Sequence, residues 1–365
     1  ALVAVLAAIP VSCTDTVATA VEKSAGLCVT PAVCTPPAAK YSLVRPVQSR
    51  QQWLDSGGYC GALSVQAIAL SYGAWVSQDQ VRKAAGPGKH GRMVMHYNIA
   101  KALDNLKLTH EDWDWKGQAT PQFEKYLVFL KRQLAHGHPV VWMITTKEFG
   151  AESADQIDGF PPVPIYTHIE PVWGIFSNRS LSDTAVYPED VLVHGADYGA
   201  AGSVEGPWLY RRFDTLADSP LMRGNCSSAQ VGIGKNEYYP CIMWSTALGY
   251  AITGVVEPST NRSLPVSLAV NLFDEPDYPW TEDKPIELHG TVTIESLEPG
   301  QQYTLLRWDD YKKVPTDGNY LLSDYDRQYS FIAAGVREVY EDPATFISSG
   351  TAYYRCVKGA APARK

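Results

Sequence analysis

The stretch that decides the fold is Gln51-Gln52-Trp53-Leu54-Asp55-Ser56-Gly57-Gly58-Tyr59-Cys60-Gly61-Ala62-Leu63-Ser64. After it, residues 62–72 carry apolar side chains at near-helical spacing without Gly or Pro, which predicts a helix beginning immediately after Cys60 and Gly61. The positive end of a helix dipole and its unpaired N–H groups favour a thiolate over a thiol. Cys60 is therefore the candidate nucleophile, and the alternatives are a buried small hydrophobe or a disulfide partner.

The chain continues from helices into strands. Helices are predicted at residues 78–85, 97–106 and 120–135, the last with Thr120 as cap and Pro121 at its first position. Short apolar runs rich in β-branched residues predict strands at 139–144, 165–176 and 191–193. A helical part followed by a strand-rich part predicts an α+β fold with a cleft between the two parts.

Two further regions follow. Residues 200–239 are rich in Gly, Ser, Pro and Asn, and we expect a long insertion held by a Cys226–Cys241 bridge. Beyond residue 264 the pattern predicts strands at 266–272, 286–294 and 303–308, separated by turn signals at 298–300 and 317–319. Strands at this spacing predict a C-terminal β-sandwich of about 100 residues. Residues 296–303 resemble the tyrosine corner of fibronectin type III domains.

The N-terminal segment is typical of a secreted protein. Residues 1–9 are small and apolar like a secretory signal, although a buried helix is the alternative, and residues 12–40 form a Cys/Pro/Thr-rich leader. The predicted organisation is a signal-like leader at 1–40, a hydrolase domain at 41–256 and a β-sandwich accessory domain at 264–365.

Composition narrows the class of protein. The formal net charge of −8 is spread without basic or acidic runs, which argues against nucleic acid as a partner. Beyond the N-terminal run, no apolar stretch approaches the roughly 18 residues of a membrane span. The 7 cysteines could form three bridges and leave one free thiol, and Asn178, Asn225 and Asn261 begin glycosylation sequons. These features predict a secreted, extracellular glycoprotein with disulfides.

Tyr59, Cys60 and Gly61 at the start of a helix, with a Gln upstream, resemble the papain-like cysteine peptidases and in particular the C39-type peptidases. The resemblance implies that a Gln side chain and the Cys60 backbone N–H form an oxyanion hole. Gln52 is the expected residue, with Gln51 as its neighbour. The separation between this Gln and Cys60 is longer than the usual spacing in the family, and glycines fill part of the difference.

A thiolate nucleophile needs a base, which is usually a His from another element. His168 opens the strand His168-Ile169-Glu170-Pro171-Val172-Trp173-Gly174-Ile175, which resembles the family segment whose His faces the nucleophile. We therefore expect His168 to be the base. His136 and His138 flank a turn and are expected to be structural. Ordinary polar roles are expected for His90, His96, His110 and His289.

In the family an Asp or Asn at the end of the next strand orients the His. The segment 191–199 resembles that strand and turn, which makes Asp197 the candidate, with Asp190 and His194 as competitors. Asn178 is a poor alternative because of its sequon. Glu170 is expected to be a solvent-facing carboxylate.

No paired CxxC, HxxxH or HExxH arrangement predicts a metal, and residues 86–91 lack a dinucleotide or phosphate-loop motif, so no cofactor is expected. The resemblance implies a secreted thiol hydrolase that cleaves peptide or amide bonds in a peptide or protein substrate. Surface or glycan attachment would fall to the C-terminal domain. The alternatives are a non-catalytic binding or structural protein on the same scaffold, and an acyl transferase of the same fold.

Overall fold

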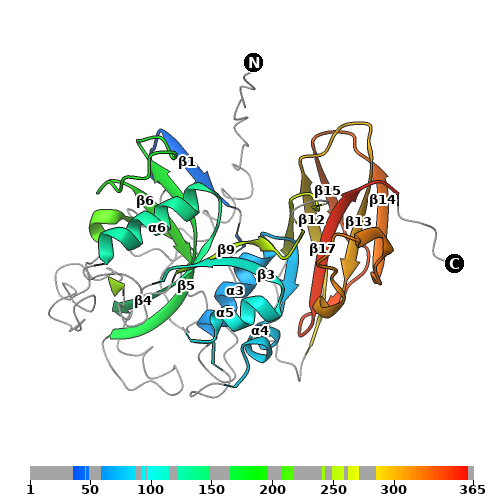
Figure 1. Ribbon diagram of the computed structural model, residues 1–365, viewed down its shortest axis with the longest axis horizontal. Coiled ribbons are helices and arrows are strands. Elements are labelled where there is room, and N and C mark those ends of the chain that lie inside the picture. Colours follow the sequence, from blue (N-terminus) through cyan, green and yellow to red (C-terminus); the bar gives the residue numbers. More distant parts are fainter. Residues whose placement is uncertain are drawn as a thin grey trace.

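The computed structural model describes residues 36–45, 47–48, 59–87, 93–94, 97–114, 122–147, 165–195, 208–216, 241–242, 249–258, 262–270 and 285–360. Within these ranges the chain combines α-helices with mainly antiparallel strands, which confirms the α+β class. Figure 1 shows a part built from a large sheet and its helices beside a part built from the C-terminal strands. The candidate nucleophile and base lie in the first part.

The described helices follow the apolar patterning of the sequence. They are α3 (Cys60–Leu70), α4 (Gln78–Ala85), α5 (Ile99–Asn105) and α6 (Phe123–Ala135), with short 3-10 turns η3 (Phe213–Thr215), η6 (Tyr311–Lys313) and η7 (Tyr320–Leu322). α3 is buried on all sides from Gly61 onward, as expected of a helix without a polar face. α6 begins later than predicted, after Gln122, which makes no side-chain cap. The predicted cap and first residue, Thr120 and Pro121, lie outside the described residues.

Eight of the described strands form one sheet, in which β3, β9, β4, β5, β6 and β7 are neighbours in that order. β1 pairs with β5, and β8 pairs with β4. Their bounds are β1 (Tyr41–Val44), β3 (Leu108–Asp112), β4 (Val140–Lys147), β5 (Ile165–Ser177), β6 (Val191–Gly195), β7 (Trp208–Arg212), β8 (Cys241–Ile242) and β9 (Gly249–Val255). All of these pairings are antiparallel.

β7 corrects part of the prediction, because it lies within the stretch expected to be a long insertion. Its aromatic residue Tyr210 is buried with Val193 of β6, and the Tyr210 ring meets the Phe176 ring edge-on at 5.8 Å. β7 thus pairs with the edge of β6 that is opposite β5. Packing against β6 outweighs the loop-like composition of the surrounding sequence.

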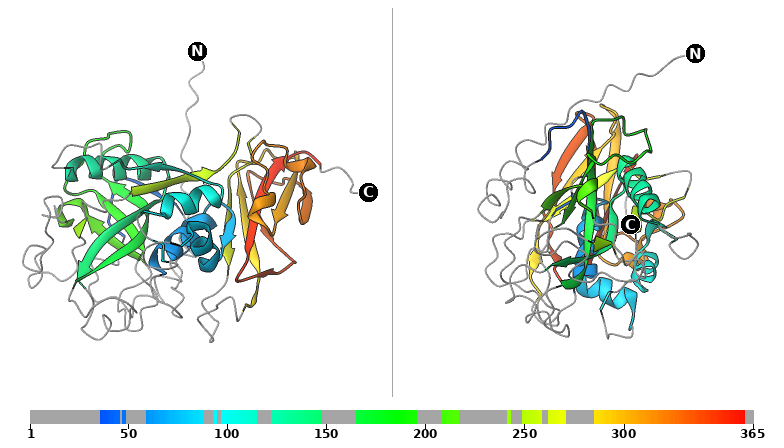
Figure 2. Two further views of the ribbon diagram at one scale, coloured as in Figure 1. Left: turned by 60° about the horizontal axis from the view of Figure 1, so that its bottom comes forward. Right: turned by 90° about the vertical axis from the view of Figure 1, so that its left-hand side faces the viewer.

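Helices cover both faces of the first sheet. On one face, Met143 and Ile169 share a buried cluster with residues of α3 and α5. On the other face, Trp142 and Val172 pack with apolar residues of α6. The left view of Figure 2 shows α6 and α3 on different sides of the sheet strands. β5 therefore lies between the helix that carries Cys60 and α6.

The C-terminal strands form two sheets and a short pair. β10 (Val266–Val270), β12 (Gly290–Glu295) and β15 (Arg337–Glu341) make one sheet. β14 (Arg327–Ile332), β13 (Gln302–Trp308), β17 (Thr351–Lys358) and β2 (Ala74–Val76) make the other, while β11 (Glu287–Leu288) pairs with β16 (Phe346–Ile347). Leu268, Val292 and Tyr354 belong to one buried cluster that draws on both sheets. At the predicted corner, the Glu298 N–H donates to the Tyr303 hydroxyl at 2.9 Å.

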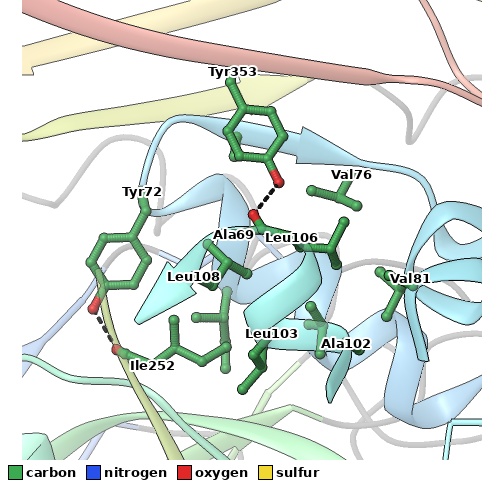
Figure 3. Packing of buried hydrophobic residues seen from close by; sticks show 14 of the residues in the cluster. Ala69, Tyr72, Val76, Val81, Ala102, Leu103, Leu106, Leu108, Ile252 and Tyr353 are labelled. Carbon is green, nitrogen blue, oxygen red and sulfur yellow. Dashed lines mark hydrogen bonds between the residues drawn. The ribbon is translucent and has the colours of Figure 1, made fainter. Parts of the chain in front are cut away.

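β2 joins the two parts of the molecule, because it follows α3 in sequence yet pairs with β17. Thr351 lies opposite Val76, and Tyr353 lies opposite Ala74. Figure 3 shows the Tyr353 hydroxyl reaching the Leu106 carbonyl oxygen, at 2.9 Å, among buried side chains of the helical part. The C-terminal strands and the helices therefore share a continuous core.

Candidate active site

Cys60 is the first residue of α3 and its side chain is partly exposed, without a disulfide bond. The first turn of α3 holds no acidic residue, and Tyr59 in the cap position makes no side-chain cap hydrogen bond. The N-terminal amides of the helix are therefore not offset by a carboxylate in the first turn. N–H groups at the start of a helix can donate hydrogen bonds to an oxygen held beside them.

Ser64 holds the first turn of α3 against β5. Its hydroxyl lies 2.8 Å from the Cys60 carbonyl oxygen and 3.2 Å from the Ile169 carbonyl oxygen. The Ser64 side chain is fully buried. The contact fixes the start of the helix beside the stretch of β5 that contains Ile169.

His168 immediately precedes Ile169 on β5, and its backbone pairs with Ile144 of β4. The structure therefore brings the strand segment of the predicted base next to the first turn of the nucleophile helix. The His168 side chain lies outside the described residues, as do Gln51, Gln52 and Asp197.

The course of β6 bears on Asp197. β6 pairs antiparallel with β5, with Phe176 opposite Val191 and Val172 opposite His194. β6 therefore runs toward the end of β5 that carries His168, and it ends at Gly195. Asp197 follows this end of the strand closely in the sequence.

Both neighbours of Cys60 are fixed by packing. The Tyr59 hydroxyl donates to the Asp79 carboxylate at 2.9 Å, and the Arg82 guanidinium lies 3.9 Å from the centre of the Tyr59 ring. At Gly61 a side-chain methyl would lie 2.7 Å from the Val94 carbonyl oxygen, which explains a glycine at this position. The backbone around Cys60 is thus held on both sides.

The two competitors for the third catalytic position are engaged elsewhere. Asp190 is buried in an ion pair with Lys131, 2.8 Å from oxygen to nitrogen, and it also accepts from the Ser177 hydroxyl. His194 is buried against Glu170, with 2.6 Å between its Nδ1 and the carboxylate. Both residues serve the core of the sheet and not the start of α3.

Glu170 corrects a prediction, because it is buried and not solvent-facing. Its carboxylate accepts from the Trp142 indole N–H at 3.2 Å as well as contacting His194, whose Nε2 accepts from Arg211 at 3.3 Å. Sequence reasoning missed this cluster. The signal was available, since Glu170 shares a strand face with apolar Val172 in a strand that has buried residues on both faces.

Cys356 is a second free cysteine among the described residues, and it is fully buried in β17. Burial raises the pKa of its thiol to about 12, so it is not a competing nucleophile. With Cys60 and Cys356 both free, at most two bridges can form within the chain, one fewer than the three that seven cysteines allow. A cysteine in a β-strand core behaves as a small hydrophobe, which sequence parity does not reveal.

Two histidines outside the candidate site have local partners. His138 Nδ1 lies 2.9 Å from the Gln133 side-chain oxygen, where desolvation and the nearby His136 lower its pKa. His110 lies between Asp104 and Asp112, and its hydrogen bond to Asp112 raises its pKa. Neither residue lies on the elements that carry Cys60 and His168.

Within the described ranges, no group of three His, Cys, Asp or Glu side chains is arranged to hold a metal ion. None of the described helices has the length and apolar character needed to cross a membrane. Compared with models of protein families, with curated proteins and with solved structures, the chain matches none of them.

Proposed function

We propose that the chain is a secreted thiol hydrolase in which Cys60 attacks a peptide or amide carbonyl and His168 transfers the proton. The observation that carries the proposal is the contact of Ser64 with both the Cys60 and the Ile169 carbonyl oxygens. It places a free, partly exposed thiol at a helix N-terminus within one turn of the strand residue that follows His168.

The proposed reaction has two halves. The Cys60 thiolate adds to the substrate carbonyl, and the negative oxygen is stabilised by the N–H groups at the start of α3 together with Gln52. Collapse of this intermediate breaks the carbon–nitrogen bond, and the amine leaves with the proton carried by His168. Water then attacks the thioester, giving its proton to His168, releasing the acid and regenerating the Cys60 thiolate. Asp197 orients His168.

The architecture proposed for this activity is a papain-like domain followed by a fibronectin-like β-sandwich. An all-buried helix with a cysteine at its start, packed against an antiparallel sheet, supports the first assignment. The Glu298 to Tyr303 hydrogen bond and the buried cluster shared by the two C-terminal sheets support the second. Passage through a secretory pathway is part of the proposal, since the Asn178 side chain of the first sequon is exposed.

The test is the rate of iodoacetamide labelling of Cys60 as a function of pH, read by peptide mass spectrometry. A Cys–His pair labels rapidly well below pH 8.5, roughly where a free cysteine ionises. We expect this behaviour in the wild type and its loss in His168→Ala, with His289→Ala as a matched control. Ordinary thiol behaviour in the wild type would overturn the proposal.

A non-catalytic binding protein on the same scaffold is the second candidate function. The alternation of β5 favours it, because Ile169 packs on the α3 side of the sheet whereas Glu170 lies among residues of the opposite side. Successive residues of a strand point to opposite faces. Equal labelling of the wild type and His168→Ala would favour this candidate over the hydrolase.

A further inference from the structure

The C-terminal strands contact the start of α4 through one tight turn, residues 348–350. The Ser77 hydroxyl donates to the Ser349 carbonyl oxygen at 2.8 Å, and the Ser77 N–H donates to the Gly350 carbonyl oxygen at 3.1 Å. The Trp75 indole N–H donates to the Ser348 carbonyl oxygen at 3.1 Å. The turn is thus joined to the segment between α3 and α4 by three hydrogen bonds.

Ser77 is also the N-cap of α4. Its backbone is extended, with φ −62° and ψ 151°, and its hydroxyl oxygen accepts from the Gln80 N–H at 3.1 Å. One fully buried hydroxyl therefore fixes where α4 begins and where the C-terminal turn meets it. A change at this hydroxyl alters the position of the first turn of α4.

The first two turns of α4 in turn hold Tyr59. The Asp79 carboxylate accepts a hydrogen bond from the Tyr59 hydroxyl. The Arg82 guanidinium lies over the ring of Tyr59, a residue that is only 5% exposed. Since Tyr59 is covalently joined to Cys60, a shift of α4 moves the backbone that carries the thiol.

We infer that Ser77 is a positioning residue for Cys60, through which the C-terminal turn at 348–350 sets the reactivity of the thiol. The inference rests on the proposed function, because it assigns a role to the C-terminal strands in that same site. The contacts run from Ser349 to Ser77, then through Asp79 to Tyr59 and Cys60. The C-terminal strands are on this view part of the reactive unit and not a detachable accessory.

The test compares Ser77→Ala with Ser77→Thr, each read by the pH profile of Cys60 labelling and by thermal unfolding of the full chain. Ser77→Ala removes both hydrogen bonds of the hydroxyl. We expect the labelling of Cys60 near pH 7 to slow by about tenfold, because a small displacement of a reacting group lowers its reaction rate by this order. Ser77→Thr keeps a capping hydroxyl and is expected to retain most of the wild-type rate.

Tyr353→Phe is the matched control, because it removes a buried hydrogen bond between the same two parts without touching α4. We expect it to lower the melting temperature while leaving the labelling profile unchanged. If Ser77→Ala labels like the wild type, or if Tyr353→Phe slows labelling equally, the inference is wrong.

Tyr59→Phe extends the test and remains informative if Ser77→Ala does not fold. It removes the hydroxyl held by Asp79 while leaving the cap of α4 in place. It is expected to slow labelling, and its effect should not add to that of Ser77→Ala, because both act on one set of contacts. An unchanged rate in Tyr59→Phe contradicts the inference. These results are separate from the His168→Ala comparison, which tests the proposed function itself.

Discussion

Lys131 and Asp190 form an ion pair in which the ammonium nitrogen lies 2.8 Å from a carboxylate oxygen and both side chains are almost fully buried. The pair ties α6 to the loop before β6. Lys131→Met leaves the Asp190 carboxylate buried without a counter-charge, and breaking such a pair costs about 3–5 kcal/mol of unfolding free energy. Urea denaturation measures this loss. Lys358→Met, at the exposed pair with Glu298, is the control and should change stability little.

We expect the stability of the C-terminal strands to fall in acid because of the buried carboxylate of Asp342. Burial by itself raises the pKa of Asp342, but hydrogen bonds from Tyr329, Tyr354 and Arg307 outweigh it and the net pKa is lowered. A lowered pKa gives stability that is complete above the unfolded value of about 3.9 and is lost as pH falls through the folded value.

Denaturation of the wild type and Asp342→Asn at several pH values tests this linkage. The gap in unfolding free energy should be largest at neutral pH and should narrow below about pH 4. The exposed carboxylate Asp324 offers a control, since Asp324→Asn should show no comparable gap. A pH-independent gap for Asp342→Asn would show that the carboxylate is not selectively stabilised in the folded state.

The contribution of His110 to stability is expected to depend on pH in the opposite direction. The hydrogen bond to Asp112, aided by Asp104, raises its pKa despite partial desolvation. The stabilisation is complete below the unfolded value of about 6.5 and is lost as pH rises through the folded value. NMR titration of His110 in the wild type and in Asp112→Asn measures the shift, and the variant should titrate at lower pH. Asp114→Asn, outside the contact, should leave the titration unchanged.

Cys356 is expected to stay unmodified in the folded protein. It is fully buried and burial raises its pKa to about 12, whereas Cys60 is partly exposed. Iodoacetamide at pH 7 should therefore alkylate Cys60 first, and Cys356 should react only in denaturant. Peptide mapping before and after unfolding distinguishes the two thiols. Rapid native labelling of Cys356 would mean that β17 opens locally.

Gly61→Ala is expected to disturb the first turn of α3. The added methyl would lie 2.7 Å from the Val94 carbonyl oxygen, a distance that backbone atoms do not tolerate without movement. We expect lower stability and a changed rate of Cys60 labelling. Gly335→Ala is the control, because its new methyl would meet only an ordinary contact at 3.8 Å. Thermal unfolding and labelling together measure both effects.

Local pattern was enough to predict the four described helices and the strands β4, β5, β6, β10, β12 and β13, whereas it predicted no strand at β1, β2, β3, β7, β9, β14, β15 or β17. A helix was predicted at residues 78–85 and α4 occupies that range, while its cap, Ser77, is a finding of the structure. The runs at residues 139–144 and 165–176 have strand length and β-branched composition, and both form strands. The predicted turns contain Gly300 and Gly318, whose positive φ angles suit glycine.

Long-range pairing could not be predicted in the same way. β2 is only Ala74–Val76, and its place in the C-terminal sheet depends on β17, far along the chain. The burial of Glu170 likewise depends on His194 and Trp142, which come from neighbouring strands. At the candidate site, the sequence located Cys60 at the start of a helix. The contact of Ser64 with Ile169 required the fold.

The hydrogen bond between Ser77 and Ser349 spans 272 positions of sequence. During synthesis at about 5–20 residues per second, a ribosome needs roughly 14 to 54 s to make the chain between these residues. For that time α3, β2 and α4 exist without β17, the strand that pairs with β2. The apolar surface around β2 stays uncovered. An apolar surface and a strand edge left uncovered in this way are prone to aggregation until β17 has been made.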